Sequence, residues 1–279
     1  MVAEKTPESP IDMTKDALAL RVEGDYVSAA GTTLGGADGI AVAMALAILD
    51  SSEIAHPALE AGFTVDEEIG MEGAQGLDFS QLSARRMLNI DSEDEGIFTV
   101  SCVGGASANV SVGLTMAPHA APCAKQTVTG LIGGHSGQEI NKGRANANIL
   151  LGRVLDALVQ KLPARLVSAA GGRKDNAIPN AAEAVLALAE GDLPAAKQIV
   201  SACTADLRKE YAVADPGVTV TLEEAAVCPQ ALTEEATLRV VRYLLLVPNG
   251  IAAMSMDIPG LGLTSCNLCI FHVAHCVRT

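Results

Sequence analysis

The segment Phe63-Thr64-Val65-Asp66-Glu67-Glu68-Ile69-Gly70 ends a short apolar run in three successive carboxylates and a glycine. Neighbouring carboxylates repel one another, and burying any of them costs free energy unless a positive charge lies close by. Two interpretations fit the segment by itself. It is a solvated acidic turn at a strand end, which is the common situation for a run of charges. Alternatively, one carboxylate binds a metal ion and a neighbour acts on metal-bound water.

Strand-like and helical segments alternate on both sides of this acidic segment. Residues 61–65 and 86–90 are expected to be strands, and residues 40–50 and 71–77 are expected to be helices. This alternation is typical of an α/β fold with a mainly parallel sheet. An alternating stretch at residues 18–27, interrupted by a glycine turn, predicts a hairpin before it.

From residue 105 onward the pattern changes to that of antiparallel strands covered by helices. The expected strands are residues 108–114, 126–132, 184–188 and 218–222, and the expected helices are residues 144–162, 194–211 and 234–246. We therefore predict an α/β domain at residues 1–105, an α+β domain at 106–265 and a divergent tail at 266–279.

The composition excludes several classes of protein. Hydrophobic residues make up 49% of the 279 residues, which is enough for a packed core. A formal charge of −14 argues against nucleic acid or an anionic membrane as a partner. No apolar run is long enough to span a membrane, and the start lacks the pattern of a signal peptide. The seven cysteines are an odd number, and four of them lie far apart, so we expect a reducing, cytoplasmic location.

Three acidic groups in the first domain lie next to expected strand or helix ends. They are Asp38, the run 66–68, and Asp91 with its neighbours 93–95. Open α/β sheets bind ligands at the carboxyl ends of their strands, so these groups predict a carboxylate-rich pocket. Zinc, manganese or cobalt would suit such a pocket. The alternative, that each acid is a solvated loop residue or a helix cap, stays open on spacing alone.

Several sequence strings occur in an order found in one family of enzymes. They are GTTLG at 31–35, TVDEEIG at 64–70, NIDSE at 89–93, GGHSG at 133–137, KGRANAN at 142–148, DNAIP at 175–179, PNG at 248–250 and MSMDIPGL at 254–261. Together they resemble the aminoacyl-histidine dipeptidase (cytosolic non-specific dipeptidase) family of dizinc metallopeptidases. The resemblance implies an incomplete α/β zinc-peptidase catalytic domain followed by an α+β lid domain of the dimerisation type.

The resemblance also implies roles for individual residues. Glu67 would be the general base, and Glu68 and Asp91 would each bind one of two metal ions. His135 would hold the substrate carbonyl or its tetrahedral oxyanion, although a glycine-loop histidine by itself favours a structural hydrogen bond. Weaker candidates for substrate contacts from the lid are Arg144, Asn176 and Asn148.

The sequence departs from the family pattern at the metal ligands. The family has Ala-Asp-Asn-Gly where this chain has Gly36-Ala37-Asp38-Gly39, so Asp38 either replaces the bridging aspartate one residue late or stands in the asparagine position. The two histidine ligands of the family fall outside the matching segments, which predicts a truncated chain that binds metal weakly. The tail contains Cys266, Cys269, His272 and His275, which form either a small zinc cluster or, in our preferred interpretation, an unstructured end.

The predicted function is metal-dependent hydrolysis of Xaa-His and other unblocked dipeptides, impaired here by loss of the histidine ligands. The expected cofactors are two divalent metal ions, with zinc preferred over manganese or cobalt. The alternative function is that of an inactive, truncated relative that acts at most through association of its lid domain. Small dipeptides are the expected substrates, a homodimer is allowed, and neither nucleic acid nor a membrane is an expected partner.

Overall fold

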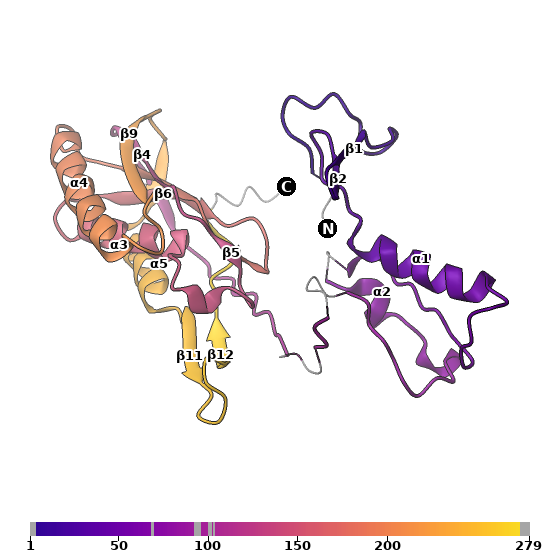
Figure 1. The fold of residues 1–279 in the computed structure, drawn as a ribbon. Coiled ribbons are helices and arrows are strands. Elements are labelled where there is room, and N and C mark those ends of the chain that lie inside the picture. Colours follow the sequence, from indigo (N-terminus) through magenta and orange to yellow (C-terminus); the bar gives the residue numbers. More distant parts are fainter. Residues whose placement is uncertain (1–3, 68–69, 92–95, 100–101, 103, 274–279) are drawn as a thin grey trace. The chain divides into compact units, whose positions relative to one another are not determined.

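The computed structural model describes residues 4–67, 70–91, 96–99, 102 and 104–273 (Figure 1). The chain consists of two compact units, Met1–Gly105 and Ala106–Thr279. Helices and strands occur in both, which confirms a mixed α/β protein. Within the described ranges, no helix combines the length and the apolar character needed to cross a membrane.

The first unit contains few regular elements. A hairpin joins β1 (Leu20–Glu23) to the antiparallel β2 (Tyr26–Ala29), as predicted. The expected helices are present as α1 (Ala37–Asp50) and α2 (Glu72–Gln75), and a 3-10 turn, η2 (Phe79–Gln81), follows.

The parallel sheet predicted for this unit is wrong for the residues that the structure describes. Residues 61–65 and 86–90 form no strand, and β1 and β2 make the only sheet among the described residues of the unit. Parallel sheets occur almost only where helices cover both faces, which buries the side chains of their strands. The large side chains of Phe63, Val65 and Met87 are instead more than half exposed.

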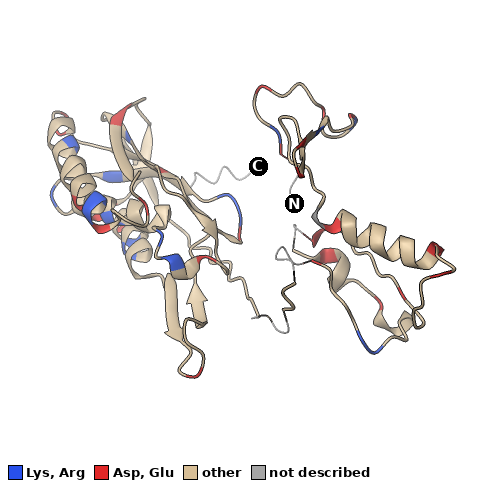
Figure 2. Cartoon of the chain, viewed as in Figure 1, with Lys and Arg blue, Asp and Glu red and all other residues tan. Residues whose placement is uncertain are grey.

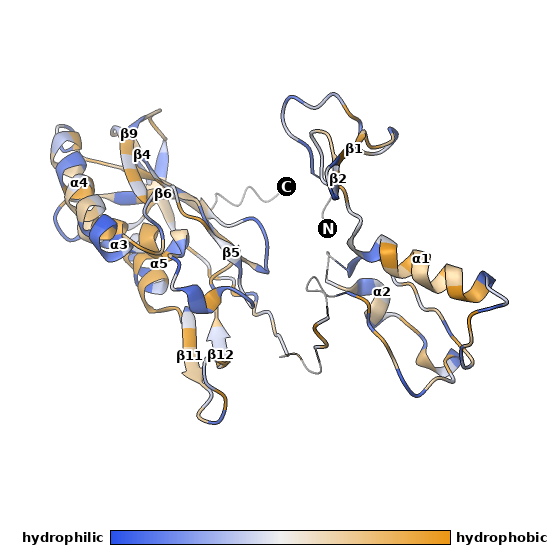
Figure 3. Cartoon of the chain, viewed as in Figure 1, coloured by the Kyte–Doolittle hydropathy of each residue, from blue (hydrophilic) through white to orange (hydrophobic). Residues whose placement is uncertain are grey.

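Burial differs sharply between the two units. None of the described residues of the first unit is buried, although α1 is apolar around most of its surface (Figure 3). A helix that is apolar all round normally lies inside a protein. Among the residues that the structure describes, the buried ones all belong to the second unit, and the first of them along the chain is Cys123.

The second unit is built on a five-stranded antiparallel sheet with the strand order β13-β6-β8-β4-β9. Three of the predicted strands appear, shifted by a few residues, whereas residues 108–114 form none and the sequence did not predict β6 or β13. The strands are β4 (Cys123–Thr129), β6 (Arg165–Gly171), β8 (Ala182–Ala187), β9 (Thr219–Ala225) and β13 (Phe271–Val273).

Three helices form a layer against this sheet (Figure 1): α3 (Ala147–Val159), α4 (Leu193–Glu210) and α5 (Glu234–Leu246). The central α3 contacts both other helices and strands β4, β6 and β8. Side-chain caps begin two of the helices. The Asn146 side chain accepts from the backbone N–H groups of Asn148 and Ile149, and the Thr233 side chain accepts from Ala236. The main core lies between this layer and the sheet.

The opposite face of the sheet carries a smaller cluster of Cys123, Ala187 and Ala231. Neighbouring residues of a strand point to opposite faces, so Cys123 belongs to this cluster while Ala124 belongs to the main core. Paired ribbons complete the unit: β3 (Met116–Pro118) with β10 (Gln230–Leu232), β11 (Gly250–Met254) with β12 (Gly262–Cys266), and β5 (Gly134–His135) with β7 (Ala177–Ile178). A 3-10 turn, η3 (Ile140–Lys142), follows β5.

Candidate functional site

The short β5–β7 pair brings two of the sequence strings together. His135 pairs with Ala177, and the backbone N–H of Ser136 donates to the carbonyl oxygen of Asn176 at 2.9 Å. His135 and Asn176 are both exposed. The GGHSG and DNAIP strings, about forty residues apart, are therefore joined in one short antiparallel pair.

The His135 ring is oriented by its own loop. Its Nδ1 atom accepts hydrogen bonds from the backbone N–H groups of Gly137 at 3.1 Å and Gln138 at 3.2 Å. A ring nitrogen that accepts carries no hydrogen, so the neutral imidazole has its hydrogen on Nε2. A Cβ at Gly137 would lie 3.2 Å from the ring, so glycine leaves room for this arrangement. The Nε2–H group is a hydrogen-bond donor on an exposed ring.

Glu139 ties the His135 loop to two basic side chains. Its carboxylate accepts from the backbone N–H of His135 at 2.9 Å and from Lys142 Nζ at 2.7 Å, and it lies 3.1 Å from Arg144 Nη1. The hydrogen bond from Lys142, followed by that from the His135 backbone, lowers the pKa of Glu139 from 4.5 to about 2. The sequence analysis did not select Glu139; its place four residues after His135 is the only signal that could have done so.

Arg144 contacts the His135 loop at two further points. Its Nη1 group donates to the carbonyl oxygen of Gly133 and pairs with Glu139, and the side chain is largely buried. Gly134 has a φ of +135°, and a Cβ there would collide with the side chains of Glu139 and Arg144. The paired glycines of the GGHSG string thus let two charged groups pack directly against the backbone. His135, Arg144 and Asn176 lie in one cluster of loops.

Asn148 lies inside the protein rather than at its surface. It is fully buried, and its Nδ2 group donates to the carbonyl oxygen of Leu268 at 3.1 Å. The neighbouring Asn146 caps α3 and donates to Asn249 and Asn267, each at 3.0 Å. Both asparagines therefore join segments of the second unit, and this placement gives no support to a substrate contact by Asn148.

The acidic candidates of the first unit are exposed. Asp38 lies in the first turn of α1, and Glu67 follows Asp66, whose φ of 57° turns the chain there. Asp91 is also exposed, and Glu68 lies outside the described residues. Acidic segments are spread along this unit, including the start of α1 and α2 (Figure 2). Where the chain is described, no three His, Cys, Asp or Glu side chains come close enough together to hold a metal ion.

The Cys/His tail is likewise not gathered into a ligand set. Cys266 lies in β12 and His272 in β13, while the Cys269 thiol donates to the carbonyl oxygen of Asp175 at 2.6 Å. His275 is outside the described residues. The zinc-cluster interpretation therefore receives no support from the part of the tail that the structure describes.

Three comparisons with known proteins agree with one another. Residues 127–215 match the peptidase dimerisation domain. The chain is 36% identical to the cytosol non-specific dipeptidase of Escherichia coli (strain K12) over 270 residues, which are 96% of this chain and 56% of that protein. The crystal structure of aminoacylhistidine dipeptidase from Vibrio alginolyticus matches with a TM-score of 0.64 and 33% identity, over 96% of this chain and 55% of that one.

The chain is a relative of the aminoacylhistidine dipeptidases. This relationship confirms the resemblance inferred from the sequence strings. The chain spans just over half the length of these dipeptidase relatives. The dimerisation-domain match begins within β4, extends past the end of α4 and contains both His135 and Arg144.

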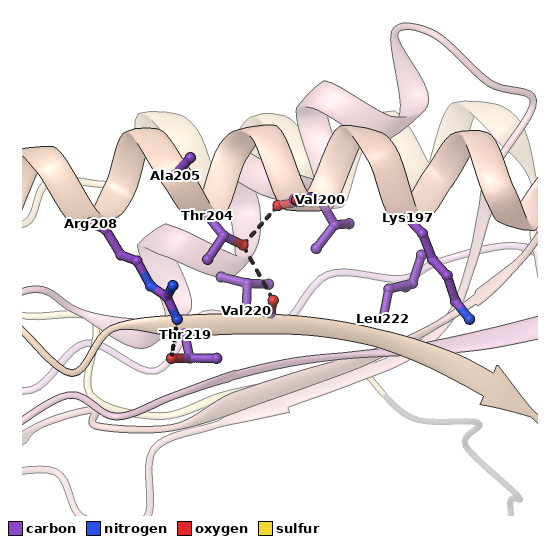
Figure 4. Close-up of a pocket in the computed structure, with 9 residues that line it drawn as sticks. Lys197, Val200, Thr204, Ala205, Arg208, Thr219, Val220 and Leu222 are labelled. Carbon is purple, nitrogen blue, oxygen red and sulfur yellow. Dashed lines mark hydrogen bonds between the residues drawn. The ribbon is translucent and has the colours of Figure 1, made fainter.

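A groove elsewhere in this dipeptidase relative is separate from the candidate site. It has a volume of about 340 Å³ and lies between α4 and β9, with Lys197 and Arg208 near its two ends (Figure 4). Arg208 donates to the hydroxyl of Thr219 at 3.2 Å, and Thr204 bridges the carbonyl oxygens of Val200 and Val220. Its lining contains no carboxylate, imidazole or thiol, so it offers no metal ligand or general base.

Proposed function

We propose that this chain carries out metal-dependent hydrolysis of dipeptides, including Xaa-His. The observation that carries the proposal is the 36% identity, over 96% of the chain, to a protein named as a dipeptidase. The clustering of His135, Arg144 and Asn176 in the second unit supports it, because these residues come from three of the strings on which the resemblance rests.

The proposed hydrolytic roles in the first unit rest on the resemblance. Glu67 would take a proton from the attacking water and pass it to the leaving amine. Glu68, Asp91 and Asp38 would bind two divalent cations, zinc in preference to manganese or cobalt. Because the described acids do not form a metal centre, the metal-dependent part of the proposal has its support in the family resemblance alone.

The proposed substrate contacts in the second unit have geometric support. The exposed Nε2–H of His135 can donate to a substrate carbonyl oxygen, and this hydrogen bond would strengthen as negative charge develops there. Arg144 is held by Glu139 and Gly133 a short distance along the chain, and Asn176 lies across the β5–β7 pair. These side chains are suited to the polar ends of a small peptide.

We propose a homodimer and a cytosolic location as further properties. The matched domain is described as a dimerisation domain, and β9 is an edge strand of the sheet, beside which a strand of a second copy could pair. The location follows that of the Escherichia coli relative, whose name places it in the cytosol.

Metal analysis together with dipeptide turnover tests the proposal. Purified full-length chain incubated with zinc should bind about two divalent ions weakly and hydrolyse alanyl-histidine at a reduced rate. Asp91→Asn should lose metal, and Glu67→Gln should lose turnover but keep metal. Glu53→Gln, a change at an exposed acid with no assigned role, is the matched control. A folded protein with neither metal nor turnover would reject the proposal in favour of an inactive relative.

A further inference from the structure

A buried carboxylate lies at the base of the two loops that carry His135 and Arg144. Asp215 is fully buried. One of its oxygens accepts from the backbone N–H of Ile132 at 2.7 Å, and the other accepts from the backbone N–H of Ala145 at 2.6 Å. Ile132 immediately precedes the GGHSG string, and Ala145 immediately follows Arg144.

A carboxylate in this position is costly for the fold. Removing the charge from water is unfavourable, and none of the ion pairs among the described residues involves Asp215. The two charge-assisted hydrogen bonds from backbone N–H groups therefore offset the free-energy cost of burying the carboxylate. These bonds join segments 83 and 70 residues away in the chain, so the carboxylate fixes the spacing between two loops.

Asp215 is itself held firmly. It follows α4, where its backbone N–H donates to the carbonyl oxygen of Tyr211 at 2.9 Å and its own carbonyl oxygen accepts from Val218 at 3.0 Å. Two residues later, Gly217 lies so close to Gly130 that a Cβ on Gly130 would overlap the Gly217 carbonyl. The carboxylate thus projects from a turn whose position is set by α4 and β9 and by direct backbone contact.

A second set of contacts connects the same two loops further out. Arg144 donates to the carbonyl oxygen of Gly133 and pairs with Glu139, which accepts from the backbone N–H of His135. The two loops are therefore joined at two places: through Asp215 where they begin, and through Arg144 and Glu139 further out. Moving either loop at its base would move His135 and Arg144 relative to each other.

We propose that Asp215 is a positioning residue of the dipeptide site. Its carboxylate sets the orientation of the His135 Nε2–H group and of Arg144 toward the substrate, without touching the substrate itself. This inference rests on the proposed function for its chemical meaning, whereas the geometric effect on His135 can be measured in the absence of turnover.

The experiment compares Asp215→Asn and Asp215→Ala with Asp206→Asn in the full-length chain. Asp206 is an exposed acid of α4 that pairs only with Lys209 among the described residues, so its replacement is the matched control. Long-range ¹H–¹⁵N NMR of the histidine rings, assigned with His135→Gln, reports the tautomer of His135. We expect the Nε2–H form in the wild type, a changed His135 signal in both Asp215 variants and an unchanged one in Asp206→Asn.

Turnover of alanyl-histidine gives the second measurement. The Asp215→Asn variant should lower kcat about tenfold to a hundredfold, with a smaller change in KM, because misplacing a group that acts in the transition state has this effect. In a His135→Ala background the same change should lower kcat by a clearly smaller factor, because the part of its effect that acts through His135 is already lost. A purely structural role would lower kcat by the same factor in both backgrounds and would overturn the inference.

Amide hydrogen exchange of the wild type keeps the test independent of variant folding. The Ile132 and Ala145 amides should be protected, and exchange at the rate of free amides would overturn the inference. A wild type without turnover, but with a His135 signal that depends on Asp215, rejects the proposed function and upholds the positioning role. Turnover that is unaffected by both Asp215 variants rejects the positioning role and upholds the function.

Discussion

Gly152 is the position where the close contact between α3 and α5 can be tested most directly. A Cβ at Gly152 would lie 2.5 Å from Leu244 Cβ, whereas carbon atoms in contact normally lie about 3.5–4.0 Å apart. Gly152→Ala would therefore force α5 away from α3 by about 1 Å or more. In an open helix the same change stabilises by about 1 kcal/mol, because alanine has the higher helix propensity.

The two effects of Gly152→Ala oppose each other, and overpacking should win. Overpacking a core lowers the free energy of unfolding by about 1–3 kcal/mol. After the gain in helix propensity is subtracted, we expect the free energy of unfolding to fall by about 1 kcal/mol. For a domain of this size that corresponds to a fall in Tm of about 2–4 °C. Circular dichroism at 222 nm during heating, together with urea unfolding, measures the change.

Gly39→Ala in α1 is the matched control, because a Cβ there meets nothing within 4 Å and the residue has no positive φ. The Gly39→Ala variant should leave Tm and the free energy of unfolding unchanged or slightly raised. Adding Leu244→Ala to Gly152→Ala should not rescue stability, since the overlapping atom is the Cβ that alanine keeps. A Gly152→Ala variant as stable as the wild type would refute the contact between these helices.

Two further predictions concern single hydrogen-bond acceptors. The folded-state pKa of Glu139, about 2, lies below its ordinary value of 4.5. The stabilisation of the folded state by this carboxylate is therefore fully present above pH 4.5 and is lost as the pH falls through about 2. Glu139→Gln should abolish that dependence in an NMR titration of the His135 amide, and a titration midpoint near 4.5 in the wild type would contradict it. Thr237→Val should cost about 1–3 kcal/mol in urea unfolding, because the buried Leu166 N–H, 3.1 Å from the Thr237 hydroxyl, loses its acceptor. Thr237→Ser keeps the acceptor and should cost clearly less; equal losses would show that packing dominates.

Local patterns predicted the helices of the second unit well. Residues 234–246 were expected to be helical, and α5 has these bounds, because its apolar residues recur at helical spacing and Thr233 caps its start. Strand prediction was less reliable, because a strand exists only where a partner lies alongside it. Residues 108–114 alternate like a strand yet form none, whereas β6, rich in small residues, lies between β8 and β13.

The candidate site was predictable only in part, for a related reason. The sequence strings selected His135, Arg144 and Asn176, which the structure places in one cluster of loops. Asp215 was not selected, because its role comes from two backbone N–H groups more than sixty residues away, and a lone aspartate before a proline indicates only a turn. The acids of the first unit remain a prediction from resemblance, since their partners depend on how that unit is packed.

The absence of buried side chains among the described residues of the first unit has a consequence for the life of the protein in a cell. A segment without an interior has no cooperative unfolding transition, so its turns open one by one at little cost. Chaperones and proteases recognise chains that expose apolar segments such as α1. We therefore expect turnover of the polypeptide to begin in the first unit, so that the stability of this unit limits the cellular lifetime of the chain.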